Sequence, residues 1–148
     1  MADQWRLTAD NSMSSSGNTD ITSNWERNDN SGFGQLGTGM TESSGIFTFP
    51  STGIYMVIVN ATFRGNSENS MSVFFDVTTN NSSYNTIAAA DNGQRNGTDT
   101  NVGAGCSSII DVTDTSNVKV RFSVGSIDSG SQFDGNTEQN RTSFTLQV

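Results

Sequence analysis

Apolar residues alternate with polar residues in short runs along most of the chain, and this alternation restricts the possible folds more than any other feature. Residues 70–79, for example, place Met71, Val73, Phe75 and Val77 at every second position. No segment repeats apolar residues at helical spacing over three turns. Clusters of Gly, Asn, Ser and Asp separate the runs. The pattern predicts an all-β protein built as an antiparallel sandwich or barrel.

The strand signal occurs in about ten segments. Their expected ranges are 4–9, 20–27, 33–40, 45–50, 53–64, 70–79, 84–90, 101–112, 117–125 and 142–148. Longer polar connections are expected at 11–19 and 126–140. We expect residues 1–148 to form a single domain, because 148 residues is the size of one ordinary domain and no internal repeat is present.

Composition argues against several classes of function. The formal net charge is −8, with 7 Lys and Arg residues and no His. Nucleic-acid binding needs a basic surface, and His is the usual general base and zinc ligand. No apolar run approaches the ~20 residues of a membrane-spanning helix. We therefore expect a protein that is not an enzyme, with no catalytic residues, no cofactor, no metal site, no nucleic-acid partner and no membrane insertion.

Paired carboxylates and one cysteine are the remaining candidates for chemistry. The nearest carboxylate pairs are Asp111 with Asp114, Asp128 with Asp134, and Asp91 with Asp99. All six are expected at turns, where Asp is favoured because it hydrogen bonds to the backbone. Oxygen ligands suited to calcium are plentiful, but the Asp-x-Asp-x-Asp-Gly loop is absent. Cys106 stands in a mixed apolar run and is expected to be a packed, inert thiol.

The polar loops offer a surface on which a glycan could bind. The aromatic side chains that could stack on a sugar are Tyr84, Phe133 and, if it is exposed, Phe33. The alternative for Tyr84 is a residue at the edge of a strand with no ligand, and this is the interpretation that we favour.

Residues 43–57 have the most informative pattern in the chain. Phe47 and Phe49 end one strand, Pro50 fits the second position of a type I turn, and Gly53 suits a positive φ after it. The strand that follows, 53–64, is apolar on both faces. An antiparallel sheet normally leaves one face in water, so this strand must be covered twice. The second cover is either a loop of the same chain or another subunit.

This segment resembles the tumour-necrosis-factor/complement-globular-head superfamily of trimeric jelly rolls. The Phe-x-x-Pro-x-x-Gly-x-Tyr spacing is met by Phe47, Pro50, Gly53 and Tyr55, and Phe144 matches a Phe in the last strand. The resemblance covers nearly the whole chain. It implies a tumour-necrosis-factor-like antiparallel jelly-roll sandwich of about ten strands, assembled as a homotrimer.

Two features depart from the cytokine and complement members of that superfamily. No collagen-like stalk precedes the domain, and the N-terminus has no signal-peptide pattern. The strands of Trp5 and Trp25, followed by the Gly-rich stretch 32–40, resemble small structural proteins of tailed bacteriophages, particularly marine ones.

The phage resemblance implies a non-enzymatic structural protein of the virion surface, made in the host cytoplasm. It would be a homotrimeric capsid decoration or a fibre/knob domain, with capsid, portal or tail proteins as partners. The alternative is a receptor- or glycan-binding module at the tip of a tail or head fibre, with a host-surface glycan as its partner.

The superfamily resemblance also implies that the trimer packs one sheet around a threefold axis. Strand 53–64 and the C-terminal strand beside it would supply the contact. The predicted interface residues are Tyr55, Val57, Val59, Phe144 and Leu146. A shift of the alternation by one residue would replace them with Ile54, Met56 and Ile58.

Overall fold

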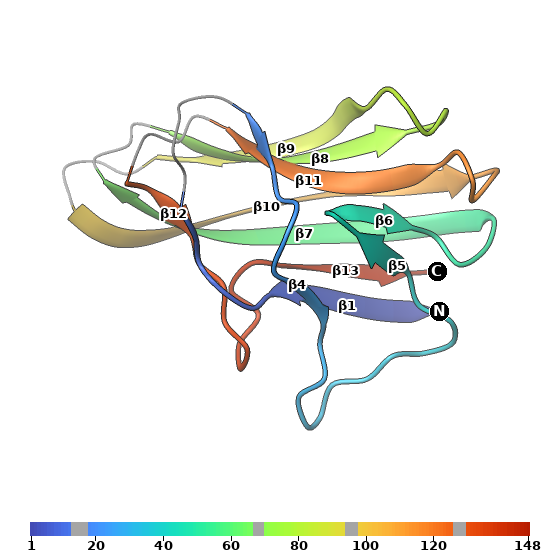
Figure 1. The fold of residues 1–148 in the computed structure, drawn as a ribbon, viewed down its shortest axis with the longest axis horizontal. Coiled ribbons are helices and arrows are strands. Elements are labelled where there is room, and N and C mark those ends of the chain that lie inside the picture. The colour runs from blue at the N-terminus through green and yellow to red at the C-terminus, as the bar shows by residue number, and fades with distance from the viewer. Residues whose placement is uncertain (13–17, 67–69, 94–97, 126–129) are drawn as a thin grey trace.

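Two antiparallel β-sheets packed face to face form the fold (Figure 1). The computed structural model describes residues 1–12, 18–66, 70–93, 98–125 and 130–148, and these residues contain no helix. The larger sheet contains β1 (Ala2–Leu7), β2 (Asn11–Ser12), β4 (Trp25–Arg27), β7 (Gly53–Asn66), β10 (Thr98–Val112), β12 (Gln132–Phe133) and β13 (Ser143–Gln147). The smaller sheet contains β3 (Thr19–Asp20), β5 (Thr41–Ser43), β6 (Ile46–Thr48), β8 (Met71–Thr78), β9 (Asn85–Asn92) and β11 (Lys119–Gly125). The expected all-β antiparallel sandwich is confirmed.

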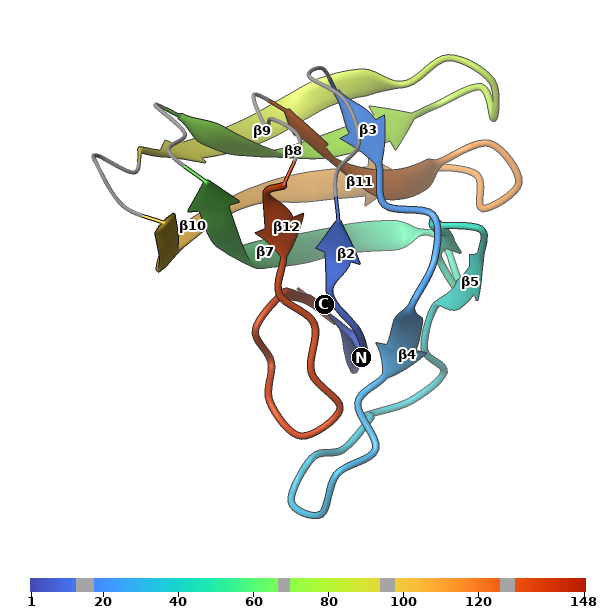
Figure 2. The same ribbon diagram turned by 60° about the vertical axis from the view of Figure 1, so that its left-hand side comes forward.

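The long strand β7 organises the larger sheet. It pairs with β10 along one edge, and with β13 and then β12 along the other. β13 continues the sheet to β1 and β4, while β12 continues it to β2. The smaller sheet runs in the order β5-β6-β11-β8-β9, with β3 beside β11. The N- and C-terminal residues lie side by side in both views, and the Val148 amide donates to the Met1 carbonyl at 3.0 Å (Figures 1 and 2).

The core lies between the two sheets and is rich in aromatic rings. The ring centroid of Phe47 lies 5.4 Å from those of Trp5 and Trp25 and 4.6 Å from that of Phe144. Phe122 from the smaller sheet lies 4.6 Å from Phe144. The inward-facing sets predicted for the two central strands of the smaller sheet are buried, namely Met71, Val73, Phe75, Val77, Val118, Val120, Phe122 and Val124. Period-two alternation therefore identified the core of this sheet correctly.

The segment that carries the superfamily resemblance folds as expected. Phe47 and Phe49 are buried, and Gly53 has a positive φ of 148°. Upstream, the two-residue turn between β5 and β6 has positive φ at Ser44 (54°) and Gly45 (79°). A Cβ at Gly45 would overlap the carbonyl oxygen of Ile21, so only glycine fits there.

Other expected strands differ in the structure. The expected strand 20–27 is two strands on different sheets, because the chain crosses between the layers with Asn24 in the left-handed region at φ 65°. The expected edge strand 33–40 is a loop that pairs with β1 by a single bridge, between Ala2 and Leu36. Glycines interrupt that stretch, so it has few side chains to pack on a sheet. The short strands β2 and β12 lie in the expected polar connections 11–19 and 126–140, of which 13–17 and 126–129 fall outside the described residues.

The described residues include no helix that is long and apolar enough to cross a membrane.

Candidate subunit interface

The outer face of the larger sheet is covered on one side and open on the other. On the β1 and β4 side, the outward-facing Arg6 is only 1% exposed because loop 28–30 folds over it. The side-chain amide of Asn28 donates a hydrogen bond of 2.8 Å to the side-chain oxygen of Asn140, and this bond connects loop 28–30 to the loop that precedes β13. The side formed by β7, β10 and β13 has no comparable cover among the described residues, so it is the free half of the face.

Apolar side chains gather at one end of this free half. Ile54, Met56, Ile109 and Val148 are 54%, 37%, 68% and 71% exposed, and we call these four residues the outer patch. Met56 and Ile109 are direct cross-strand partners, so they stand side by side on the same face. The four residues and Gln147 surround a shallow hollow of about 400 Å³. Isolated exposed apolar residues are ordinary, but a gathered patch marks a surface that binds another molecule.

The five predicted interface residues do not lie on this face. They are Tyr55, Val57, Val59, Phe144 and Leu146, and each is 2% exposed or less. All five point into the core between the sheets, and the Tyr55 hydroxyl donates to the carbonyl of Ser51 at 2.9 Å. A neighbouring subunit cannot reach side chains that their own chain already covers, so the assignment of these five to an interface is wrong. The one-residue shift gives the outward set instead, with Ile54 and Met56 exposed and Ile58 half-buried.

The carboxylates singled out in the sequence serve varied structural roles. Asp114 lies in a turn, as expected, and accepts bonds from the amide of Ser116 and the side chain of Asn117. Asp91 and Asp111 lie in strands rather than turns. Asp91 accepts a bond from the Ser72 hydroxyl, while the side chains of Asp99 and Asp128 are outside the described part of the chain. No group of three or more potential metal ligands gathers among the described residues.

The three candidate aromatics for glycan stacking occupy different environments. Phe133 is fully buried against Phe63, so its assignment to a glycan surface is wrong. Tyr84 is half-buried and stacks on the Arg121 guanidinium group, 4.2 Å from the ring centroid. The pKa of Tyr84 is raised overall. Burial and the negative charge of Asp20 raise it more than the positive charge of Arg121 lowers it. Phe33 is 48% exposed on the loop between β4 and β5.

Cys106 is expected to react slowly as a nucleophile. Its side chain packs against the core beneath β10, and burial raises its pKa to about 11. At about pH 8 the fraction of thiolate is roughly a hundredfold lower than it would be at a pKa of 9. A more basic thiolate is a stronger nucleophile, and this raises the rate constant of each thiolate by about tenfold. A colorimetric disulfide reagent should therefore modify native Cys106 at least about tenfold more slowly than the thiol of the unfolded chain. Equal rates for the native and unfolded protein would contradict this assignment.

Solved structures of other proteins share this two-sheet architecture. No protein-family model matches the sequence, and no curated protein matches it. Murine APRIL at pH 8.0 is similar in structure, with a TM-score of 0.69 at 10% identity over 98% of this chain and 95% of that one. Eiger TNF from S. frugiperda has a TM-score of 0.68 at 13% identity, over 99% and 90% of the two chains. The globular domain of zebrafish complement 1qA has a TM-score of 0.59 at 11% identity, over 99% and 95%.

The fold is the tumour-necrosis-factor-like jelly roll. Identities of 10–13% establish the fold and not the function. In this tumour-necrosis-factor-like chain, the outer patch lies on the free face of the larger sheet. The sequence resemblance therefore identified the fold correctly, while the five residues that it assigned to a subunit contact on β7 and β13 face the core.

Proposed function

We propose that this chain is a homotrimeric structural protein of a bacteriophage virion, located at the virion surface as a capsid decoration or as a fibre or knob domain. The observation that carries the proposal is the outer patch, an exposed apolar surface on a chain in which only 32% of residues are hydrophobic. The tumour-necrosis-factor-like fold and the resemblance of the N-terminal strands to small phage structural proteins support it.

A closed trimer repeats one contact three times, and each contact joins two different surfaces. The outer patch supplies the first surface, and its hollow of about 400 Å³ can receive a side chain. We assign the second surface to the edge where β9 lies against β10. The side-chain amide of Asn92 donates to the Gly103 carbonyl at 2.6 Å there, and Ile87, five residues earlier on β9, is 43% exposed. Ile87 of one subunit would then enter the hollow of the next, burying apolar side chains from both.

Two measurements test this proposal. Light scattering should give a mass three times the 15.8 kDa of one chain, and a mass equal to one chain would contradict the trimer. Quantitative mass spectrometry of purified particles should find the protein among the virion components. Hundreds of copies would identify a decoration protein that contacts the capsid, while tens or fewer would identify a fibre, portal-proximal or tail part. Absence from purified particles would contradict the structural role.

Recognition of a host-surface glycan at a fibre tip is a second candidate function. The observation that favours it is a polar hollow at the other end of the larger sheet, around Arg64 and Arg141.

A further inference from the structure

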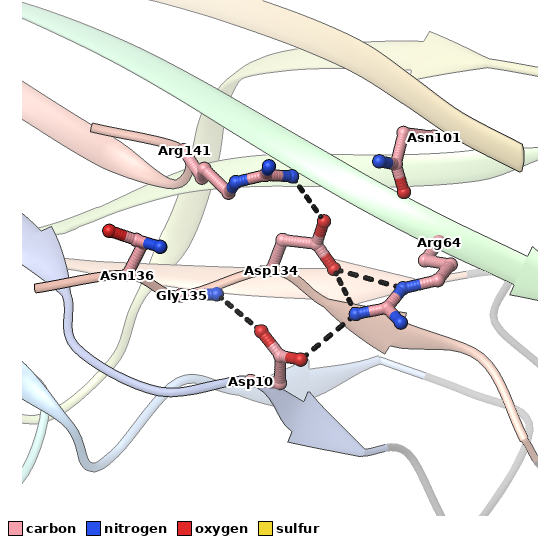
Figure 3. A pocket seen from close by; sticks show the side chains of 7 residues that line it. All are labelled: Asp10, Arg64, Asn101, Asp134, Gly135, Asn136 and Arg141. Atoms are coloured by element: carbon pink, nitrogen blue, oxygen red, sulfur yellow. Dashed lines mark hydrogen bonds and ion pairs between the residues drawn. The ribbon is translucent and has the colours of Figure 1, made fainter. Parts of the chain in front are cut away.

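A polar hollow of about 450 Å³ opens at the end of β7 opposite the outer patch (Figure 3). Its walls carry two arginines, two aspartates and two asparagines, namely Arg64, Arg141, Asp10, Asp134, Asn101 and Asn136. These side chains come from segments far apart in the sequence: β7, β10, and the chain beside β2, β12 and β13. The volume is in the range of small-molecule sites, about 300–1,000 Å³, although the lining is far more polar than usual.

A row of alternating charges holds this hollow in shape. Asp134 is buried, with a side chain 3% exposed, and accepts bonds from Arg141 at 2.9 Å and from Arg64 at 3.1 Å. Arg64 also contacts Asp10 at 2.9 Å, and Asp10 accepts a bond of 2.9 Å from the Gly135 amide (Figure 3). Because the carboxylates fix the two guanidinium groups, a ligand would meet donors that are already oriented.

The charges in the hollow cancel, and this selects the ligand. An anion would approach two carboxylates in a chain whose net charge is −8. A cation would have to displace arginines from Asp134, which is buried and therefore keeps its ion pairs. An apolar group would leave the polar walls without hydrogen-bond partners. A neutral molecule with many hydroxyl groups meets none of these penalties, because each hydroxyl both donates and accepts.

We propose that this hollow binds a neutral saccharide unit. Arg64 lines the hollow, and the side chain of Arg141 is 37% exposed, so sugar oxygens can reach the Arg141 guanidinium group beyond its contact with Asp134. Figure 3 shows the Asn101 amide turned toward the same space, and Asn101 is exposed. The amide offers a donor and an acceptor on the wall opposite Arg141. This inference rests on the glycan-binding role and names the class of glycan and the residues that would recognise it.

The saccharide site and the outer patch can function together. Ten residues of β7 separate Ile54 from Arg64, which corresponds to about 33 Å of extended strand. A subunit contact at the outer patch therefore does not itself cover the hollow. Three weak sites on one rigid particle bind a multivalent surface far more tightly than one site does, because the second and third contacts are intramolecular.

The test follows the side-chain NMR signals of the hollow in deuterated, nitrogen-15-labelled protein. The neutral probes are the methyl glycosides of glucose, galactose and N-acetylglucosamine, and the charged probes are methyl glucuronide and inorganic phosphate. At least one neutral glycoside should shift the Nε–H signals of Arg64 and Arg141 and the amide signal of Asn101. Replacement of Asn101 by Ala should weaken that binding about tenfold, as expected for the loss of a hydrogen-bonding group. Asn101→Trp, which fills the hollow, should abolish it.

Asn85→Ala is the matched control, because Asn85 is an exposed asparagine on β9. It should bind the glycoside as well as the unchanged protein does. If only methyl glucuronide or phosphate shifts these signals, the hollow selects charged ligands and the neutral-saccharide proposal is overturned. If the only ligand is methyl glucuronide, the proposed glycan-binding role is still supported, because glucuronide is a sugar. If no glycoside shifts them, the glycan role and the saccharide site both fail. Retention of full affinity in Asn101→Trp would place the binding elsewhere and would also overturn the proposal.

Discussion

Replacing Ile109 with Asp is expected to convert the proposed trimer into a folded monomer. Ile109 is 68% exposed in the single chain and lies opposite Met56 in the outer patch. Burying an unpaired carboxylate at a contact costs about 3–5 kcal/mol. A closed trimer contains the contact three times, so the trimerisation constant should fall by at least about 10⁶. The fold should survive, because substitutions at exposed positions usually change the free energy of unfolding by less than about 0.5 kcal/mol.

Light scattering at a micromolar protein concentration measures this effect, and circular dichroism confirms that the variant is folded. Phe33→Asp is the matched control, since it also places a negative charge at an exposed apolar residue, on the loop between β4 and β5 and not among the residues that line the hollow of the outer patch. It should remain trimeric. A folded Ile109→Asp protein that stays trimeric would show that this half of the sheet is not the subunit contact.

Tyr55→Asp separates the two faces of β7. Tyr55 is 2% exposed, and its ring lies 4.9 Å from that of Phe49 in the core. A carboxylate there would be buried without a partner inside one chain, so the variant should fail to fold instead of forming a folded monomer. The contrast between Tyr55 and Ile109 would therefore distinguish core from interface by experiment.

The misassignment of β7 has a clear physical cause. Period-two alternation divides the strand into two sets but does not say which set faces the core, and both sets begin with apolar residues. The number of consecutive apolar residues in each set indicates which set faces the core. The inward set stays apolar as far as Phe63, whereas the outward set becomes polar at Asn60 and continues with Thr62 and Arg64. A core face must be apolar along its whole length, while a subunit contact need only be apolar in part.

The polar sites could not be predicted in this way, because they depend on contacts between distant segments. Asp10 and Asp134 are 124 positions apart, yet Arg64 contacts both. Nothing in the local sequence around Asp134 distinguishes it from the carboxylates in ordinary turns.

The turn at Asn24 was missed for a related reason: Ile21 and Trp25 both face the core, so the alternation looks continuous although the chain changes sheets between them.

Arg6 is a buried charged residue, and its burial leads to the second prediction with a large effect. It occupies an outward position on β1, where a charged residue is expected to be solvated, but it is 1% exposed. Its guanidinium group contacts Glu26 at 2.7 Å and also donates to Asn28, at 3.2 Å, and to Asn30, at 2.9 Å. Asp29 also pairs with it at 3.1 Å, but that carboxylate is 79% exposed and contributes little.

Arg6→Ala should lower the free energy of unfolding by about 2–3 kcal/mol, because it removes the buried member of an ion pair whose other member, Glu26, is 33% exposed, and takes one donor from Asn28. Arg6→Lys should be intermediate, since a compact ammonium group cannot reproduce the planar fork that contacts several residues at once. Lys119→Ala on β11 removes a positive charge from a half-exposed position and should change stability by less than about 0.5 kcal/mol. Chemical denaturation at one fixed protein concentration compares the variants with the concentration-dependent contribution of assembly held constant.

The double variant Arg6→Met/Glu26→Gln separates the loss of charge from the loss of volume. Met fills much of the space of the arginine stem, and Gln removes the carboxylate that would otherwise lose its ion-pair partner. If desolvated charge dominates the cost, the double variant should be more stable than Arg6→Ala, since replacing a buried ion pair as a whole is often close to neutral. A loss below about 1 kcal/mol in Arg6→Ala would show that loop 28–30 holds its position without the arginine. The backbone pairing of β1 with β4, and not the Arg6 network, would then be what keeps this side of the larger sheet covered.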